Sequence, residues 1–335
     1  MVSAGAVIAT LAIGYALFLT STGQAIGSPV VGSVASFESL SRTSILGVAL
    51  IAGAAAAVVA YRRQLVTEST HSLEQDRHLQ DRYVAASAQL GSDRATIRIA
   101  GANALAALAA DWDASLQRQS CVDVLCSYLR MPPLASLAPA GQSTTGGADG
   151  IRSEDHQVRL TIQRAFTIHL NATNPAKWRD ISLDLTGAEL FDFDLSGCRI
   201  DGSLTLAGAI FHGRTRFLDV VARTATFTRA EFQGDVEFRR FEVESSLFER
   251  ASFLGDADFE STILARQGSA PVSFDHAEFS GDVRFYSITA VSGLVFGDVE
   301  FHGSFLIDAS RLAEDPDQRR VEAPLELRNV HFHQC

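Results

Sequence analysis

The stretch AEFQGDVEF at Ala230–Phe238 returns in altered form as ASFLGDADF at Ala251–Phe259 and AEFSGDVRF at Ala277–Phe285. The phenylalanines keep their spacing while the residues between them change. Large apolar residues five or six positions apart fit neither a helix, which repeats them at three and four, nor a strand, which repeats them at two. The spacing fits a chain that turns a corner about every five residues, with one large and one small side chain inward on each side.

The large apolar residues also recur at a longer period. One series, with separations of 21, 21, 26 and 22 residues, runs through Phe211, Phe232, Phe253, Phe279 and Phe301. Two further series repeat these separations. Four sides then make a coil of about twenty residues, and roughly seven coils at the strand spacing of about 4.8 Å predict a rod on the order of 35 Å long. The predicted solenoid-core residues are Leu190, Leu195, Phe211, Phe227, Phe232, Phe238, Phe248, Phe253, Phe259, Phe274, Phe279, Phe285, Phe296, Phe301 and Phe332.

This pattern, from about Leu183 to Phe332, resembles the pentapeptide-repeat proteins. The resemblance implies a right-handed quadrilateral β-solenoid, in which a central Leu or Phe and the small residue two positions before it fill the interior. Phe232 and Ala230 would be such a pair here. The upstream half is similar to bacterial membrane proteins, common in actinobacteria, that join a membrane hairpin and short helices to these repeats. Most of those proteins have no assigned biochemical activity.

A Gly-Asp step lengthens one side of the coil from five residues to six at Gly234, Gly255 and Gly281. We expect these glycines to stack at one corner with positive φ, which glycine adopts without a Cβ clash. We expect the Asp that follows to cap the turn through its side chain. The longer interval near Leu264–Pro271 and the segment Arg311–Arg320 predict two loops that leave the wall.

Two uncharged apolar segments, Ala4–Thr20 and Ser44–Tyr61, open the chain, and each has the 17–18 residues that can cross a hydrocarbon core of roughly 30 Å. Arg62 and Arg63 follow, and the positive-inside rule places the downstream chain in the cytoplasm. We therefore predict a transmembrane helical hairpin over residues 1–61, with membrane lipid as partner. The expected location is the inner (plasma) membrane, multi-pass, with the repeats in the cytoplasm. A cleaved signal peptide is the alternative for the first segment, which lacks a positive n-region.

The remainder divides into four parts. Residues 62–131 predict a small juxtamembrane α-helical module, and residues 132–153, rich in Pro, Gly, Ser and Thr, predict a flexible linker. Residues 154–177 predict a capping helix, because the first coil would otherwise expose apolar core. Residues 178–335 form the repeats. The expected fold class is therefore mixed: a transmembrane hairpin, a helical module and a C-terminal β-solenoid.

Charge and cysteine usage restrict the function. The net charge is −11; residues 1–150 hold 9 basic and 10 acidic residues, and residues 151–335 hold 19 and 29. The acidity thus belongs to the repeats, and we predict no nucleic-acid partner. The four cysteines have no disulfide-framework spacing, which favours a reducing compartment.

The sequence offers little chemistry. It contains no phosphate-binding loop and no nucleophile motif, so we predict no catalytic or cofactor-binding residue, no cofactor and no enzyme. His331, His333 and Cys335 alternate on the last predicted strand and would face outward together. Three ligands on one short strand are cramped for a tetrahedral ion, so we predict no metal site and interpret them as exposed strand residues.

The leading hypothesis is a membrane-tethered pentapeptide-repeat scaffold that mediates protein–protein interaction at the cytoplasmic face, with a protein partner still unknown. The alternative is an acidic solenoid that mimics duplex DNA and binds a DNA-handling enzyme such as a type II topoisomerase, similar to the quinolone-protecting pentapeptide proteins. An enzyme with a pocket between linker and solenoid is a third hypothesis. Pairing through the terminal coils leaves a homodimer open.

Overall fold

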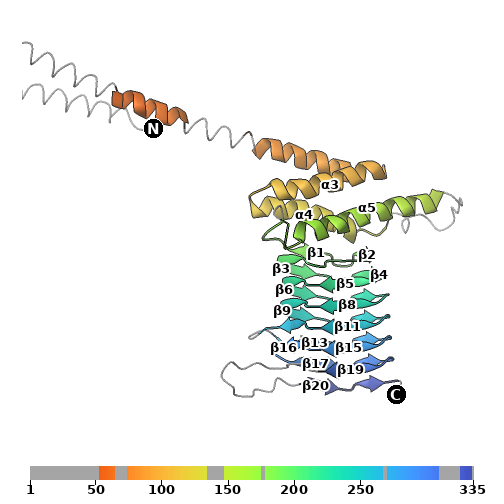
Figure 1. The fold of residues 1–335 in the computed structure, drawn as a ribbon. Coiled ribbons are helices and arrows are strands. Elements are labelled where there is room, and N and C mark those ends of the chain that lie inside the picture. Colours follow the sequence, from red (N-terminus) through yellow and green to blue (C-terminus); the bar gives the residue numbers. More distant parts are fainter. Residues whose placement is uncertain are drawn as a thin grey trace, which may run out of the picture. The chain divides into compact units, whose positions relative to one another are not determined.

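The computed structural model describes residues 53–64, 74, 76–133, 147–174, 178–266, 270–308 and 325–333. The chain separates into two compact units, Met1–Glu74 and Gln75–Cys335. In the first unit, residues 53–64 form a helix. The second unit contains the helical module and the repeats (Figure 1).

The predicted membrane hairpin is not supported. The segment Ala4–Thr20 lies outside the described residues, and of Ser44–Tyr61 only residues 53–61 are described. Residues 53–64 are described as helix, and no helix in the described part of the chain is long and apolar enough to cross a membrane. This finding contradicts the transmembrane part of the predicted fold class, the predicted lipid partner and the predicted multi-pass location in the plasma membrane.

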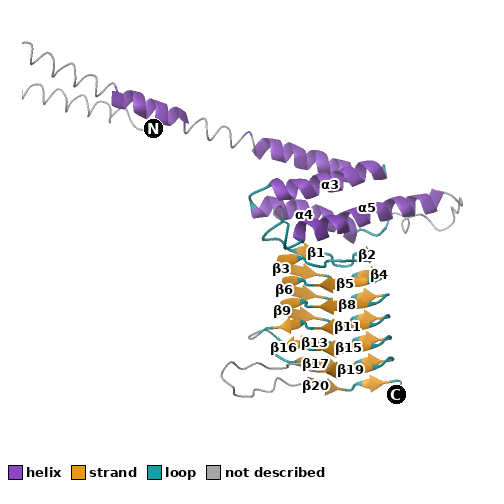
Figure 2. Cartoon of the chain, in the orientation of Figure 1, coloured by secondary structure: helices purple, strands orange, loops and turns teal. Residues whose placement is uncertain are grey.

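The helical module packs at one end of the strand stack (Figure 2). A helix of residues 76–90 precedes α3 (Ala95–Asp111), α4 (Ser115–Arg130) and α5 (Gly147–Leu170). Its core is apolar: Leu105, Leu108, Leu125 and Leu129 are fully buried. At Gly101 of α3, an added Cβ would lie 2.5 Å from the backbone nitrogen of Leu90, so a glycine is needed where the two helices approach each other.

Two glutamine side chains cover the first coil. The side-chain amide of Gln119 on α4 donates to the Ser182 carbonyl (2.9 Å) and accepts from its N–H (2.8 Å). Gln163 on α5 makes the same pair of bonds to Phe191 (2.7 and 3.0 Å). Each amide thus takes the place of the backbone that a preceding coil would supply, and so protects an edge that could otherwise pair with another chain. Trp178, 1% exposed, stacks on His169 of α5 (5.0 Å between ring centroids) and donates to the Ala106 carbonyl of α3 (3.2 Å).

The repeats form parallel sheets. In the described residues, the seven-stranded sheet contains β2 (Glu189–Phe191), β4 (Ile210–His212), β7 (Glu231–Phe232), β10 (Ser252–Phe253), β14 (Glu278–Phe279), β18 (Glu300–Phe301) and β21 (His331–Phe332). The five-stranded sheet contains β5 (Thr215–Leu218), β8 (Val236–Arg239), β11 (Ala257–Glu260), β15 (Val283–Tyr286) and β19 (Phe305–Asp308). The nine-stranded sheet contains β1 (Leu183–Asp184), β3 (Arg199–Thr205), β6 (Val221–Thr226), β9 (Glu242–Leu247), β12 (Ile263–Ala265), β13 (Val272–Ser273), β16 (Thr289–Ala290), β17 (Leu294–Gly297) and β20 (Leu325–Arg328).

The nine-stranded sheet covers two sides of the coil. The start of β9 pairs with β12 through Glu242 and Ile263, whereas its end pairs with β13 through Leu247 and Ser273. One long strand therefore turns a corner. We name the seven-stranded sheet face 1, the five-stranded sheet face 2, and the first and second halves of the long strands faces 3 and 4. The described repeats form a four-sided parallel β-solenoid of about six turns.

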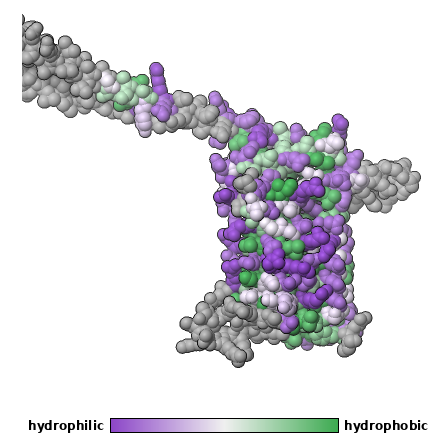
Figure 3. All heavy atoms as spheres, viewed as in Figure 1, coloured by the Kyte–Doolittle hydropathy of each residue, from purple (hydrophilic) through white to green (hydrophobic). Residues whose placement is uncertain are grey.

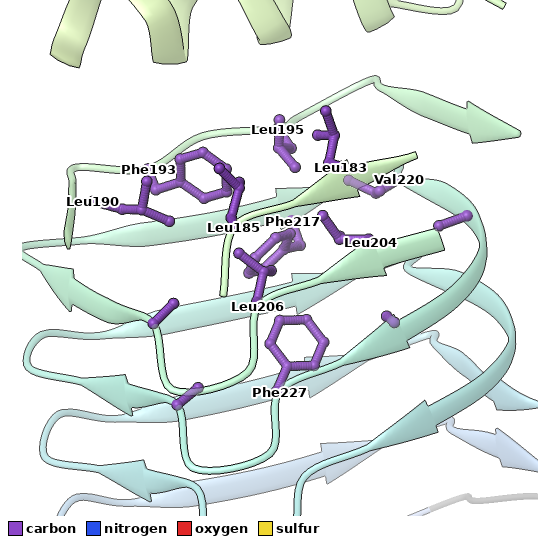
Figure 4. Packing of buried hydrophobic residues seen from close by; sticks show 14 of the residues in the cluster. Leu183, Leu185, Leu190, Phe193, Leu195, Leu204, Leu206, Phe217, Val220 and Phe227 are labelled. Atoms are coloured by element: carbon purple, nitrogen blue, oxygen red, sulfur yellow. The ribbon is translucent and has the colours of Figure 1, made fainter. Parts of the chain in front are cut away.

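Large apolar side chains fill the interior, and Figure 4 shows them in the first coils, where Leu185, Leu206 and Phe227 lie one below the other. In the following coils the phenylalanines form columns. Phe211 stacks on Phe232 and Phe232 on Phe253, with ring centroids 4.5 and 4.9 Å apart and the rings within 7° of parallel. Columns through Phe217 and Phe227 repeat this arrangement on neighbouring sides. Offset aromatic pairs stabilise a core by about 0.5–1.5 kcal/mol beyond the area they bury. The register of each coil is therefore set by its large inward residues.

The reason why glycine recurs at the stacked corner differs from the predicted one. Among the corner glycines, positive φ occurs at Gly213 but not at Gly234, Gly255 or Gly281, so the prediction of positive φ at these three is wrong. A Cβ at Gly234 would lie 2.3 Å from the Gly213 carbonyl oxygen, and one at Gly255 would lie 2.5 Å from the Gly234 carbonyl carbon. Glycine is required because the backbones of successive coils approach closely here.

The aspartates after these glycines link one coil to the next. The Asp235 carboxylate accepts from the Asp256 N–H (3.1 Å), and Asp256 accepts from the Asp282 N–H (2.9 Å). The hydroxyl and backbone N–H of Ser304 hold the pKa of Asp282 below its usual range. The predicted capping role is thus refined, because each side chain satisfies an N–H in the following coil rather than in its own turn.

The long repeat interval is accommodated at one corner. β12 ends at Ala265 and β13 begins at Val272, so the extra residues lie between faces 3 and 4. Leu264 and Ala265 remain buried, which keeps the wall intact beside the insertion. The second predicted loop, Arg311–Arg320, lies outside the described residues.

Candidate interaction surface

The predicted core residues lie inside the solenoid, with one exception. Phe332 on β21 is 51% exposed, because no further described coil covers it. The other fourteen, each at most 1% exposed, are Leu190, Leu195, Phe211, Phe227, Phe232, Phe238, Phe248, Phe253, Phe259, Phe274, Phe279, Phe285, Phe296 and Phe301. With the interior filled, any function of the described repeats falls to the outward positions.

Face 1 and the corner that follows it concentrate carboxylates. The parallel register aligns equivalent positions, so that Glu278 pairs beside Glu300 and Ser252 beside Glu231. We name this surface the acidic face. Its described acidic residues are Glu189, Asp192, Glu231, Asp235, Asp256, Glu278, Asp282 and Glu300.

Few cations compensate the acidic face. Among its described residues, Arg214 is the only Lys or Arg, and Arg214 pairs with Glu237 of face 2. Arg229 and Arg250 lie at the far edge, at the corner between faces 4 and 1. The carboxylates between these edges therefore produce a net negative potential, which attracts cationic groups.

Face 2 is charged but nearly balanced. Arg239 lies within ion-pair distance of Glu237 (3.5 Å), Asp258 (3.0 Å) and Glu260 (3.3 Å). Arg216 lies 3.6 Å from Asp194. Exposed pairs of this kind contribute little to stability, typically below about 1 kcal/mol, but they cancel the field of the face. The acidity of the repeats is therefore expressed mainly on the acidic face.

The histidines of the last strand meet residues that the sequence analysis did not select. His333 stacks on His302, with ring centroids 4.6 Å apart, and a ligand atom of Glu300 lies within 4.8 Å of both side chains. The ring centroid of His331 lies farther from that of His333, at 6.5 Å. Cys335 lies outside the described residues. His302 and His333 are 31 residues apart in the sequence. They are in contact because they occupy equivalent positions in two neighbouring coils.

A polar cluster in the helical module ties α4 to α5. It lies beside a cavity of about 480 Å³. The Asp155 carboxylate accepts from the Tyr128 hydroxyl (2.7 Å) and from Arg159 Nε (2.8 Å), and Arg159 donates to the Leu129 and Met131 carbonyls. Burial, followed by the bond to Asp155, raises the pKa of Tyr128. The side chains of Tyr128, Asp155 and Arg159 therefore satisfy one another's hydrogen bonds and link α4 to α5.

The described cysteine thiols are buried. Cys121 and Cys126 on α4 and Cys198 in the first coil are all buried and unpaired by disulfide. Burial raises the pKa of each thiol to about 12. Because the thiolate is the nucleophile and the metal ligand, these residues act as apolar packing groups.

On the side of the solenoid that Figure 3 shows, hydrophilic side chains cover much of the wall and apolar residues appear in small separate spots. A polar wall of this kind suits a charged contact better than a large apolar one. Comparisons of the chain with models of protein families, with curated proteins and with solved structures found no match.

Proposed function

We propose that the chain is a pentapeptide-repeat protein that acts as a protein-interaction scaffold, and that its acidic face binds a Lys/Arg-rich surface of a protein partner. The observation that carries the proposal is the row of aligned carboxylates with one arginine among them. The parallel β-solenoid supports the assignment to this family, because its four sides turn at the five-residue spacing of the sequence. Repeat scaffolds of this kind are usually not catalytic.

Rigidity makes the acidic face suitable for binding. Its strands pair in parallel register over successive coils, and its corner aspartates accept backbone N–H bonds. The carboxylates are thus held in place before a partner arrives, which reduces the ordering cost of binding. Exposed charges at such a surface contribute mainly to association rate and specificity. Because salt screens exposed charges, the affinity for the partner is expected to fall as ionic strength rises.

The acidic face also supports a second candidate, a mimic of duplex DNA. Eight carboxylates distributed over about six coils of 4.8 Å correspond to one charge per roughly 3.6 Å. B-DNA carries one per about 1.7 Å of axis. The solenoid therefore offers about half the charge density of DNA, which favours a protein scaffold over a DNA mimic.

Reversing two charges on the acidic face tests the proposal. The variant Glu231→Lys/Glu278→Lys is expected to weaken partner capture from native extract at least tenfold, because like charges would face the basic partner. Both side chains point away from the core, so the fold is expected to persist. The captured protein is quantified by mass spectrometry, with full-length wild-type chain immobilised in parallel.

A matched control comes from face 3. Glu242→Lys/Glu244→Lys changes the net charge equally on the opposite side of the coil and is expected to capture the partner as the wild type does. Equal losses from both variants would contradict a specific acidic face. Competition by duplex DNA of random sequence, together with a DNA-handling enzyme as the captured protein, would establish the second candidate instead.

A further inference from the structure

We propose that Glu300, His302 and His333 form a binding site for Zn²⁺ at the C-terminal end of the acidic face. Ligand atoms of the three side chains lie within 4.8 Å of one another. Two of the residues come from the segment around β18, and the third follows β21 one coil later. The residues are up to 33 apart in the sequence and adjacent in space.

The parallel register brings the ligands together. Phe301 pairs with Phe332, so the residue after each of them occupies the same outward position in successive coils. The His302 N–H donates to the Phe279 carbonyl (2.8 Å), and the His333 N–H donates to the Phe301 carbonyl (2.9 Å). These bonds hold both imidazoles on one side of the wall, with ring planes 11° apart.

The donor set is one that zinc uses. Two imidazole nitrogens and one carboxylate oxygen leave a fourth position open, as in sites that bind water or an exogenous ligand. Zn–N and Zn–O bonds of about 2.0–2.2 Å require donors about 3.3 Å apart in a tetrahedron. His302 Nε2 already lies 3.6 Å from Glu300 Oε2 and 3.7 Å from Glu278 Oε1. To bind one ion, the ligand atoms must move from within 4.8 Å of one another to about 3.3 Å, and the two stacked rings must rotate out of their parallel arrangement, because each nitrogen lone pair lies in the plane of its ring. Glu278 can supply the fourth ligand.

An earlier coil provides an internal control with one histidine. His212 occupies the same column of the acidic face, with Nε2 3.5 Å from Glu189 and Nδ1 2.7 Å from the Gln233 side-chain oxygen. In the described coils on either side, Phe191 and Gln233 occupy the equivalent positions. A second imidazole is thus missing there, and Zn²⁺ has one nitrogen ligand instead of two.

Zinc bound at this site would fasten the last described coil. His333 directly follows β21, the last described strand of the stack, where Phe332 is 51% exposed. A ligand that binds the folded state and not the unfolded chain raises stability in proportion to the logarithm of its concentration. Zn²⁺ is therefore expected to raise the temperature at which the terminal coils unfold.

Titration of the full-length chain, purified without a polyhistidine tag and stripped with EDTA, tests the site. Isothermal titration with ZnCl₂ is expected to show a micromolar or tighter site in the wild type. His302→Ala and His333→Ala are each expected to weaken it at least tenfold, since each removes a direct ligand. His212→Ala is expected to leave the affinity unchanged. Co²⁺ should give the visible absorption of a tetrahedral site in the wild type and in His212→Ala only.

The outcomes separate clearly. Unchanged Zn²⁺ affinity in His302→Ala and His333→Ala, or no micromolar site in the wild type, would overturn the proposal. Circular dichroism establishes that each variant is folded, and Glu300→Gln provides a second variant that keeps the shape of the side chain. Reduced affinity in Glu300→Gln with an unchanged spectrum of secondary structure would support a direct ligand role.

Discussion

Gly255→Ala is expected to lower the free energy of unfolding by about 3 kcal/mol, the upper part of the range for overpacking. The added Cβ would lie 2.5 Å from the Gly234 carbonyl carbon and 2.6 Å from the Asp235 nitrogen. Both are backbone atoms of the preceding coil, so no side-chain rotation relieves the contact. Denaturant unfolding followed by circular dichroism measures the loss.

Gly208→Ala is the matched control. Gly208 has φ +64° and no atom within 4 Å of an added Cβ. Arg229 and Arg250 hold the equivalent corner in later coils with φ of 59° and 57°, so a side chain is accommodated there. The expected cost is about 1 kcal/mol, from the left-handed conformation alone. Equal losses at Gly208 and Gly255 would contradict the close approach of backbones as the reason for the glycine ladder.

Phe238→Ala is expected to cost about 4 kcal/mol, within the range for removal of a fully buried Phe. Phe238 is 0% exposed and stacks between Phe217 (4.9 Å) and Phe259 (4.8 Å). Its removal leaves a cavity that spans two coil interfaces, and the flanking strands are hydrogen-bonded on both sides and cannot collapse into it. The same unfolding measurement reports the change.

Leu254→Ala serves as the control for this core substitution. Leu254 follows β10 at an outward position and is 47% exposed, so truncation is expected to change stability by less than about 0.5 kcal/mol. A loss as small as this at Phe238 would show that the column is not a continuous core.

The side-by-side arrangement of the repeats follows from the sequence because one rule applies to every coil. A large inward residue at a fixed interval, such as Phe232 followed by Phe253 and Phe279, sets both the side of the coil and the register between coils. The interval of 26 residues breaks the rule locally, yet Phe253 and Phe279 still pair. The insertion leaves at a corner, where extra residues displace no core side chain.

Local conformation was harder to predict than register. A recurring glycine is consistent with positive φ or with close backbone approach, and sequence periodicity does not distinguish them. The left-handed corners are instead occupied in most coils by residues such as Asp219, Arg240 and Ser261. The transmembrane prediction rested on two uncharged apolar segments of 17–18 residues and on the arginines that follow the second, and the described helices do not support it.

Spacing within one strand does not select the cluster of Glu300, His302 and His333. The neighbours of His333 along its own segment are His331 and Cys335. In a solenoid, however, the nearest outward neighbour is one coil away, which brings His302 and Glu300 to His333. A search of the sequence at the coil period, rather than within a strand, would have found the pair of histidines.

The most direct test of the interaction surface is site-specific photo-crosslinking in native extract. A photoreactive residue is placed at Leu254 on the acidic face and, in a separate chain, at Ile263 on the opposite face 3; both are outward and apolar. We predict a crosslinked protein from position 254 that is absent from position 263 and decreases with added salt. Adducts from position 263 alone, or the same adducts from both positions, would contradict the acidic face as the binding surface.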